Sequence, residues 1–177
     1  KHFRVKGGSK IFLYFYPVLI QRTGTKMKKL ILFTIIFAIG CEDSNIHNDS
    51  HSSNLLFVSS EGTYGNGDGS ISVFSDNEKI QTVEEVGDVV QSIIVNNDHL
   101  FVISNNSHKI KRYTITESGL KLPGIEIETS NSSPREMVIV DDKLYFTNWN
   151  SRDVKVLDLV TYSITSAITL DGVPEDI

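Results

Sequence analysis

The sequence has little of what disulfide-stapled and zinc-binding proteins depend on. It contains one cysteine, four prolines and one tryptophan in 177 residues. One cysteine cannot close an internal disulfide, and no group of cysteine and histidine residues has zinc-ligand spacing. We therefore expect neither a disulfide framework nor a bound metal or cofactor. With 40% hydrophobic and 22% charged residues, the composition is typical of a globular protein.

Charge is distributed unevenly along the chain. Residues 1–40 contain eight lysines and arginines and no acidic residue, whereas the remainder carries nine basic against 22 acidic residues, a net charge of −13. A basic leader before an acidic body is typical of a targeting segment. Because an acidic body without a basic patch repels polyanions, we expect it to bind neither nucleic acid nor anionic lipid.

A signal-like segment begins at Met27. Two lysines follow it, then ten mostly apolar residues at 30–39, then Gly40 and Cys41. A helix needs about 20 residues to span the hydrocarbon core of a membrane, so this run is too short to be an anchor. Residues 27–40 are therefore predicted to be a signal peptide that is cleaved.

The residues Ala38-Ile39-Gly40-Cys41 resemble the lipobox of bacterial lipoproteins, with Ala38 in place of the usual leucine. The resemblance implies cleavage before Cys41 and a lipid on that cysteine, which would anchor the protein to a membrane. Residues 41–53 are polar and suit a flexible tether. Glu42-Asp43 resembles the surface-export signal of Bacteroidetes lipoproteins and implies an outer-membrane or cell-surface location. An ordinary secretory signal with an unmodified cysteine is the alternative.

Residues 1–26 have no initiator methionine and contain an unrelated apolar run at 11–20 that Pro17 interrupts. We interpret them as translated upstream sequence that is not part of the protein. Peptides from residues 1–26 in a mass spectrum of the expressed product would contradict this interpretation.

Three segments of the body repeat at a fixed spacing. Leu56, Leu100 and Leu144 each open an apolar strand, and they lie 44 residues apart. A polar turn precedes each of these strands, and three further strand-like segments follow it. The second segments are 70–74, 109–115 and 153–157, the third are 79–83, around 125–127, and 163–170, and the fourth are 89–95, 134–140 and the start of one at 174–177.

Four short strands per repeat fit one blade of a β-propeller. The first strand of each repeat is apolar on both faces, as a strand packed between neighbouring blades requires. No segment after residue 53 has the 3.6-residue periodicity of a helix. The predicted fold class is all-β, a partial β-propeller with just under three four-stranded antiparallel blades, at about 54–97, 98–141 and 142–177. We expect these to belong to a longer ring of roughly seven or eight blades.

The third repeat resembles the YVTN-repeat β-propeller family. The matching segments are Leu144-Tyr145-Phe146-Thr147-Asn148, Val154-Lys155-Val156-Leu157-Asp158 and Gly172-Val173-Pro174-Glu175-Asp176-Ile177. The Gly- and Asn-rich loop of the first repeat and its Gly-Ser-Ile-Ser strand resemble the opening blade of YVTN-type surface lipoproteins of Bacteroidetes. The resemblance covers residues 54–177 and implies the propeller fold, but propellers serve many functions.

Two residues of the third repeat and one at the end of the second are candidate ligand contacts. Trp149 follows the apolar strand, in a loop where an exposed aromatic ring can stack on a ligand. Arg135 stands at the start of a fourth strand, and Asn148 ends the YVTN-like segment. The alternatives are that Trp149 packs against an adjacent loop and that Arg135 pairs with a neighbouring acid. The run Asn66-Gly67-Asp68-Gly69 has too few carboxylates for a calcium loop and favours a turn.

No nucleophile, base and orienting residue can be assembled into a catalytic site, so a non-enzymatic binding or scaffold role is favoured. Similar propeller lipoproteins act as capture subunits beside TonB-dependent transporters, which implies a small-molecule nutrient or an envelope protein as the partner. The alternative is a propeller enzyme of lactonase-like or quinoprotein-like type, and adhesion is a third interpretation.

Overall fold

The computed structural model describes residues 2–4, 10–17 and 54–177. The regular secondary structure in these ranges consists of β-strands. The strands are β1 (His2–Arg4), β2 (Lys10–Pro17), β3 (Asn54–Ser60), β4 (Gly69–Ser75), β5 (Glu78–Gly87), β6 (Val90–Asn96), β7 (His99–Ser104), β8 (Lys109–Thr116), β9 (Gly119–Glu128), β10 (Pro134–Val140), β11 (Lys143–Asn148), β12 (Asp153–Asp158) and β13 (Ile164–Thr169). The predicted signal peptide, the tether and Cys41 lie outside the described residues. Within the described ranges, no helix has the length and apolar character needed to cross a membrane.

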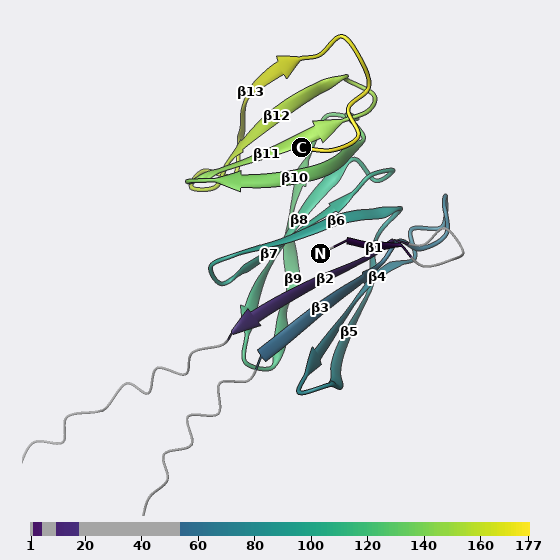
Figure 1. Cartoon of the computed structure of the whole chain (residues 1–177), viewed down its shortest axis with the longest axis vertical. Coiled ribbons are helices and arrows are strands. Elements are labelled where there is room, and N and C mark those ends of the chain that lie inside the picture. The colour runs from purple at the N-terminus through teal and green to yellow at the C-terminus, as the bar shows by residue number, and fades with distance from the viewer. Residues whose placement is uncertain (1, 5–9, 18–53) are drawn as a thin grey trace, which may run out of the picture.

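The strands form three antiparallel sheets, in the orders β1-β2-β3-β4-β5, β6-β7-β8-β9 and β10-β11-β12-β13. Figure 1 shows the sheets one above another, with β13 at one end and β5 at the other. From β3 onward, strands that are consecutive in the chain pair within each sheet. The predicted all-β class with four-stranded antiparallel sheets is confirmed.

The backbone repeats with the period read from the sequence. Three pairs of non-glycine residues 44 positions apart share a positive φ: Val89 and Ser133 (58° and 53°), Asn97 and Asp141 (51° and 52°), and His108 and Arg152 (55° and 51°). The hydrogen bond from Asn105 N to Val89 O, 2.8 Å, likewise recurs from Trp149 N to Ser133 O at 3.0 Å. Consecutive repeats therefore follow the same path through their turns as well as their strands.

The sheets begin one strand earlier than the repeats. We expected the second and third blades at 98–141 and 142–177, but the corresponding sheets run from β6 to β9 and from β10 to β13. A two-residue turn joins β6 to β7 as a hairpin, whereas the link from β5 to β6 passes from one sheet to the next. A periodic sequence gives the length of the unit but not its first strand. Residues 174–177, expected to start a fourth strand, lie outside any strand.

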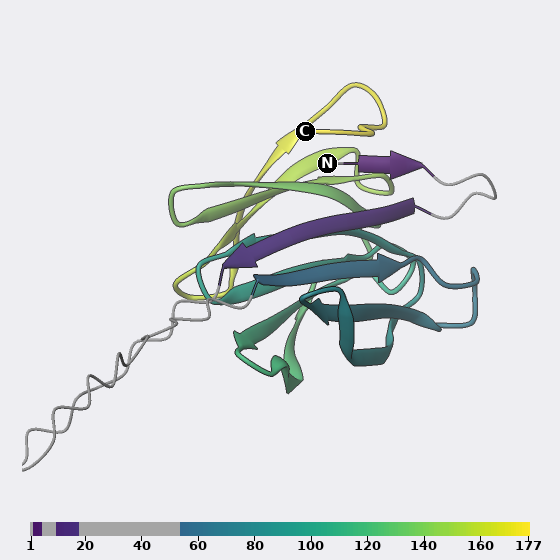
Figure 2. The ribbon, with the colours of Figure 1, turned by 60° about the horizontal axis from the view of Figure 1, so that its bottom comes forward.

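We call β2, β6 and β10 the inner strands. β6 and β10 are edge strands of their sheets, whereas β2 lies between β1 and β3. β10 lies against β6, and β6 lies against β2. β2 pairs with β3 from Phe12–Ser59 to Pro17–Asn54 and runs alongside it in Figure 2. Any extended backbone can pair with an open sheet edge. The pairing of β2 therefore does not test the interpretation of residues 1–26 as upstream sequence, which stays a prediction.

The core consists of two apolar layers, one on each face of the second sheet. Leu100 and Val102 of β7 belong to the layer shared with the first sheet, and Phe101 and Ile103 belong to the layer shared with the third. All four side chains are at most 2% exposed. The expectation that this strand is buried on both faces is therefore confirmed, and it explains why apolar residues run through it without alternation.

Candidate functional site

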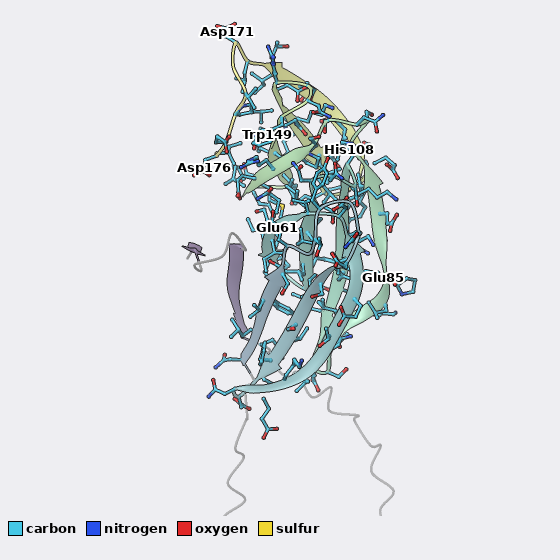
Figure 3. All side chains as sticks on the ribbon, turned by 90° about the vertical axis from the view of Figure 1, so that its right-hand side faces the viewer. Glu61, Glu85, His108, Trp149, Asp171 and Asp176 are labelled. Carbon is cyan, nitrogen blue, oxygen red and sulfur yellow. The ribbon has the colours of Figure 1, made fainter. Side chains whose placement is uncertain are left out.

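The loops that follow β3, β7 and β11 gather on one side of the molecule, which we call the loop face. Glu61, His108 and Trp149, one from each of these loops, are labelled in Figure 3. Meandering antiparallel strands place alternate connections at the same end of a sheet, which brings these loops together with the links between sheets. The loop face comprises residues 61–68, 105–108 and 149–152, with the links 88–89 and 129–133.

Two of the three predicted ligand contacts meet on the loop face. The guanidinium carbon of Arg135, the second residue of β10, lies 3.8 Å from the centre of the Trp149 ring. Arg135 Nη2 also forms an ion pair with Glu175 Oε2 at 2.8 Å. The structure thus pairs Arg135 with an acidic residue and places the Trp149 ring on a side chain of strand β10. The alternative interpretation had placed that ring against an adjacent loop. Trp149 still keeps 38% of its surface exposed.

Asn148, the third predicted contact, is fully buried. Its side-chain amide donates to Phe146 O at 3.1 Å and to Asp153 Oδ1 at 2.9 Å. Its side-chain oxygen accepts from the Ser132 hydroxyl at 2.5 Å. These bonds tie the end of β11 to the start of β12 and to the link from the second sheet, which favours a structural role for this residue.

The glycine-rich loop of residues 61–68 is held in place by two carboxylates. Asp68 Oδ1 accepts from Thr63 N at 2.5 Å, and this bond lowers the pKa of Asp68. Both oxygens of Asp88 accept from Gly65 N at 3.0 Å, and Asp88 Oδ2 also accepts from Asn106 Nδ2 at 2.5 Å. The loop is therefore fixed to the next sheet.

Tyr64 stands at the tip of this loop with 77% of its surface exposed. Sequence reasoning did not single it out, although an aromatic residue among glycines was a signal that could have found it. Among the described side chains, Tyr64 and Trp149 are the two exposed large aromatic residues. Exposed aromatic rings on an ordered loop are typical of binding surfaces.

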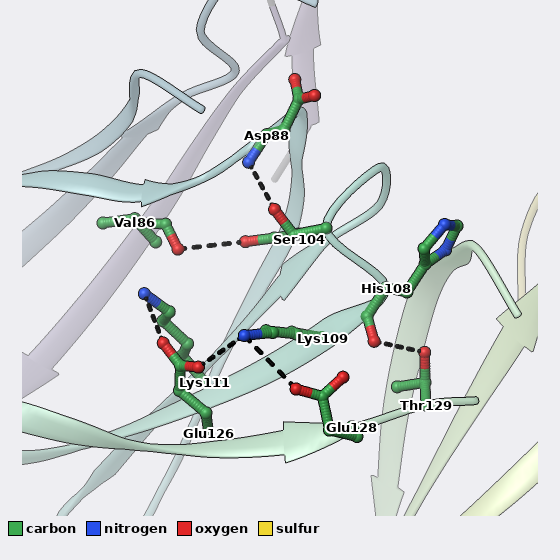
Figure 4. A network of polar contacts seen from close by, with 10 residues as sticks. Val86, Asp88, Ser104, His108, Lys109, Lys111, Glu126, Glu128 and Thr129 are labelled. Carbon is green, nitrogen blue, oxygen red and sulfur yellow. Dashed lines mark hydrogen bonds and ion pairs between the residues drawn. The ribbon is translucent and has the colours of Figure 1, made fainter. Parts of the chain in front are cut away.

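Hydrogen bonds on the loop face also join the second sheet to the third. Asn105 Nδ2 donates to Pro134 O at 2.9 Å, and Ser133 N donates to His108 Nδ1 at 3.1 Å. The Thr129 hydroxyl donates to His108 O at 2.7 Å, as Figure 4 shows. The loop face is thus an ordered surface in which each loop is bonded to a neighbouring sheet.

A second polar cluster, containing the Asn97–Asp98 turn, lies at the opposite end of the strands. Arg112 Nη1 lies 2.9 Å from His99 Nε2 and donates to the Tyr162 hydroxyl at 2.8 Å. His99 Nδ1 lies 2.9 Å from Asp98 Oδ1. Burial, and then the charge of Arg112, lower the pKa of His99, while Asp98 opposes this shift. The cluster joins the second sheet to the third and was not foreseen, because its members lie far apart in the sequence.

A concave feature lies between the outer strands β5 and β9, away from the predicted contacts. It has a volume of about 230 Å³, and Glu85, Tyr113 and Leu122 are among its lining residues. Figure 4 shows charged side chains of β8 and β9, with Lys109 of β8 2.7 Å from Glu126 and 3.3 Å from Glu128 of β9. In the described ranges, no three His, Cys, Asp or Glu side chains are grouped to hold a metal ion.

No family model and no curated protein sequence matches this chain. Among solved structures, it resembles the WD40 β-propeller domain of Doa1, with a TM-score of 0.55 and 20% identity over 70% of this chain and 39% of that one. The Myceliophteria thermophila Cps50 (Swd1) β-propeller domain gives a TM-score of 0.53 and 8% identity over 65% and 39% of the two chains. The Neurospora crassa Pan2 WD40 domain gives 0.50 and 13% over 69% and 36%.

The chain therefore spans less than half the length of these propeller domains. At such identities, the likeness bears on the fold alone. Three adjacent antiparallel sheets agree with it, as does the backbone conformation that residues 89–108 share with residues 133–152. The described sheets are blades of a β-propeller.

Proposed function

We propose that this protein is an outer-membrane or cell-surface lipoprotein whose β-propeller is a non-catalytic binding module. Its partner would be a small-molecule nutrient or an envelope protein, with nutrient capture beside a TonB-dependent transporter as the specific role. The observation that carries the proposal is the loop face, an ordered surface that presents Tyr64 and Trp149.

The order of the loop face favours binding. A surface whose loops are already fixed loses less conformational entropy when a ligand arrives. The Asp88 carboxylate and the Asn105 amide supply such fixation, because each joins a loop of one sheet to the neighbouring sheet. The propeller fold itself suggests a binding or scaffold module, and different loops adapt such a scaffold to different ligands.

The membrane anchor in this proposal is a lipid on Cys41. The cysteine directly follows a short apolar signal segment, and a polar stretch separates it from the first described residue of the body. One lipid modification site and a flexible tether would hold the propeller near a membrane without inserting it. The acidic body disfavours nucleic acid as a partner.

Metabolic labelling tests the anchor. The protein, expressed from Met27 in a Gram-negative host with a fatty-acid label, should acquire the label and partition with membranes. The Cys41→Ala variant should lose both properties. Labelling that persists in the variant, or a wild-type protein without label, would refute the lipoprotein assignment.

Affinity capture tests the binding role. The mature protein should retain a TonB-dependent receptor encoded beside it, or a nutrient of that receptor. Trp149→Ala, on the loop face, should weaken this retention, whereas Val160→Ala should not, because Val160 is 73% exposed in the turn between β12 and β13 at the other end of the strands. Equal retention by both variants would contradict a binding site on the loop face.

A further inference from the structure

Arg135 has an unused hydrogen-bond donor. Its side chain is only 14% exposed, and its Nη2 meets Glu175 Oε2 at 2.8 Å. Its Nε is buried and has no hydrogen-bond partner among the described residues. A buried donor left without a partner costs free energy, so a ligand group that accepts from Nε would bind favourably.

The unused donor lies beside the one that Glu175 uses. Nε and Nη2 form one edge of a guanidinium, and this edge matches the two oxygens of a carboxylate. In the structure, the ion pair to Glu175 engages Nη2 and leaves Nε unpaired. A carboxylate free to align with the whole edge would satisfy both donors.

Trp149 completes the site from one side. Its ring lies 3.8 Å from the guanidinium carbon of Arg135, a stacking that fixes the plane of the guanidinium. With 38% of Trp149 exposed, the ring also offers apolar surface beside the carboxylate position. The site therefore combines a charged edge with an aromatic wall.

Glu175 is held weakly in its place. Its side chain is 65% exposed, and residues 170–177 have no strand pairing. Exposed ion pairs contribute about 0–1 kcal/mol, so an external carboxylate can compete with Glu175. Arg135 itself lies at a register shift of β10, between Pro134 and Met137, which pair with Asn148 and Phe146 of β11.

The geometry points to a carboxylate-binding site at Arg135 and Trp149, which Glu175 occupies in the absence of ligand and which takes the carboxylate group of a small organic acid. The inference rests on the proposed binding function and specifies the chemistry of its ligand. Both would use the loop face, where an inner strand begins.

Nitrogen-edited NMR tests the site directly, with acetate and succinate as probes. In the mature protein carrying Cys41→Ser, either acid should move the Arg135 Nε–H resonance downfield in a saturable manner, while chloride should not. Arg112 supplies an internal control, because its Nε is also buried without a partner but its Nη1 is already bonded to Tyr162. Its resonance should stay in place. Fluorescence of Trp149, the one tryptophan of this sequence, gives a second readout.

Three variants separate the site from nonspecific anion binding. Glu175→Gln should tighten acetate binding by about threefold, since it removes a competing charge worth less than about 1 kcal/mol. Asp176→Asn removes the adjacent exposed charge and should leave the affinity unchanged. Arg135→Lys keeps the positive charge but lacks the two-donor edge, so saturable binding should weaken at least about tenfold.

Each other outcome counts against the inference. If acetate and succinate leave Arg135 Nε–H unmoved even in the Glu175→Gln variant, there is no carboxylate site. Equal binding by wild type and Arg135→Lys would place the anion elsewhere, and a response only to a glutamate-rich peptide would overturn the assignment to small acids. If acetate and succinate do not bind but receptor capture survives in Arg135→Lys, the proposed function stands while this inference fails. Carboxylate binding by a protein whose Cys41 is not lipidated would support this inference while the lipoprotein part of the proposed function fails.

Discussion

Arg112 of β8 and Tyr162 of the turn before β13 join the second sheet to the third through two interactions of one guanidinium. The Arg112 Nη1 donates to the Tyr162 hydroxyl at 2.8 Å, and the guanidinium carbon lies 4.8 Å from the centre of the ring. The residues are 50 positions apart in the chain. This contact links neighbouring blades at the end opposite the loop face, where the loop hydrogen bonds do not reach.

Removing the Tyr162 hydroxyl should weaken this junction. Tyr162→Phe keeps the ring but loses the hydrogen bond, so we expect the free energy of unfolding to fall by about 1–1.5 kcal/mol. Tyr162→Ala also removes the ring from the second core layer, against which Tyr162 packs, and should cost more. Denaturant unfolding measures both, with Tyr64→Phe on the exposed loop tip as the control. Equal stability of Tyr162→Phe and wild type would show that the hydrogen bond contributes nothing.

The same cluster should make stability depend on pH. Burial and Arg112 lower the pKa of His99 in the folded protein, so the unfolded chain binds a proton more readily. The stabilisation from neutral His99 is therefore complete above the unfolded pKa of about 6.5 and is lost as pH falls through the lower folded value. The free energy of unfolding should decrease between about pH 7 and pH 5, and less steeply in His99→Gln.

Asp98 provides the opposite control for this titration. Its charge raises the pKa of His99 against the two stronger effects. Asp98→Asn should therefore lower the folded pKa of His99 further and steepen the loss of stability in acid. A His99 pKa that rises in this variant, measured from the imidazole resonances by NMR, would contradict the account.

Gly87 and Gly65 should respond differently to alanine. Gly87 has a φ of 156°, and a Cβ there would lie 2.6 Å from the Cβ of buried Ser104, whereas Gly65, with a φ of 85°, has no atom within 4 Å of such a Cβ. Gly65→Ala should cost about 1–2 kcal/mol of backbone strain. Gly87→Ala should add about 1–3 kcal/mol of overpacking. In thermal unfolding, Gly87→Ala should therefore have the lower melting temperature. A smaller loss of stability in Gly87→Ala than in Gly65→Ala would refute the clash.

Those features of the fold that depend on the residue pattern along a single strand could be predicted from the sequence. Leu100 to Ile103 are apolar without alternation because both faces of β7 are buried, and that pattern can be read directly. The first strand of each sheet could not be read, because a 44-residue period has no marked origin. The tight turn at Asn97 makes β6 the first strand of its sheet, because it pairs β6 with β7, the strand that follows it in the chain.

The candidate site was predicted residue by residue but not as a unit. Arg135 and Trp149 were each identified, yet their stacking on one another and the ion pair to Glu175 depend on how the strand, the loop and the segment after β13 meet in space. Asn148 could not be judged from the sequence, because its amide lies in a hydrogen-bond network with Ser132 and Asp153 that only the fold brings together.

Asp88 should control the order of the loop that carries Tyr64. Its carboxylate accepts from Gly65 N with both oxygens at 3.0 Å and from the Asn106 amide. Asp88→Asn replaces one acceptor oxygen with a donor, which leaves either the Gly65 N–H or the Asn106 amide without an acceptor. Such a loss costs about 1–3 kcal/mol where the donor is buried, and less here because the loop is exposed. We expect faster hydrogen exchange at Gly65 N and faster proteolysis within residues 61–68. Asp171→Asn, in the exposed segment after β13, is the matched control and should change neither rate. Exchange at Gly65 that is as slow in Asp88→Asn as in the wild type would mean that the loop is ordered by its own turn and by Asp68 alone, and that the binding surface does not need the neighbouring sheet.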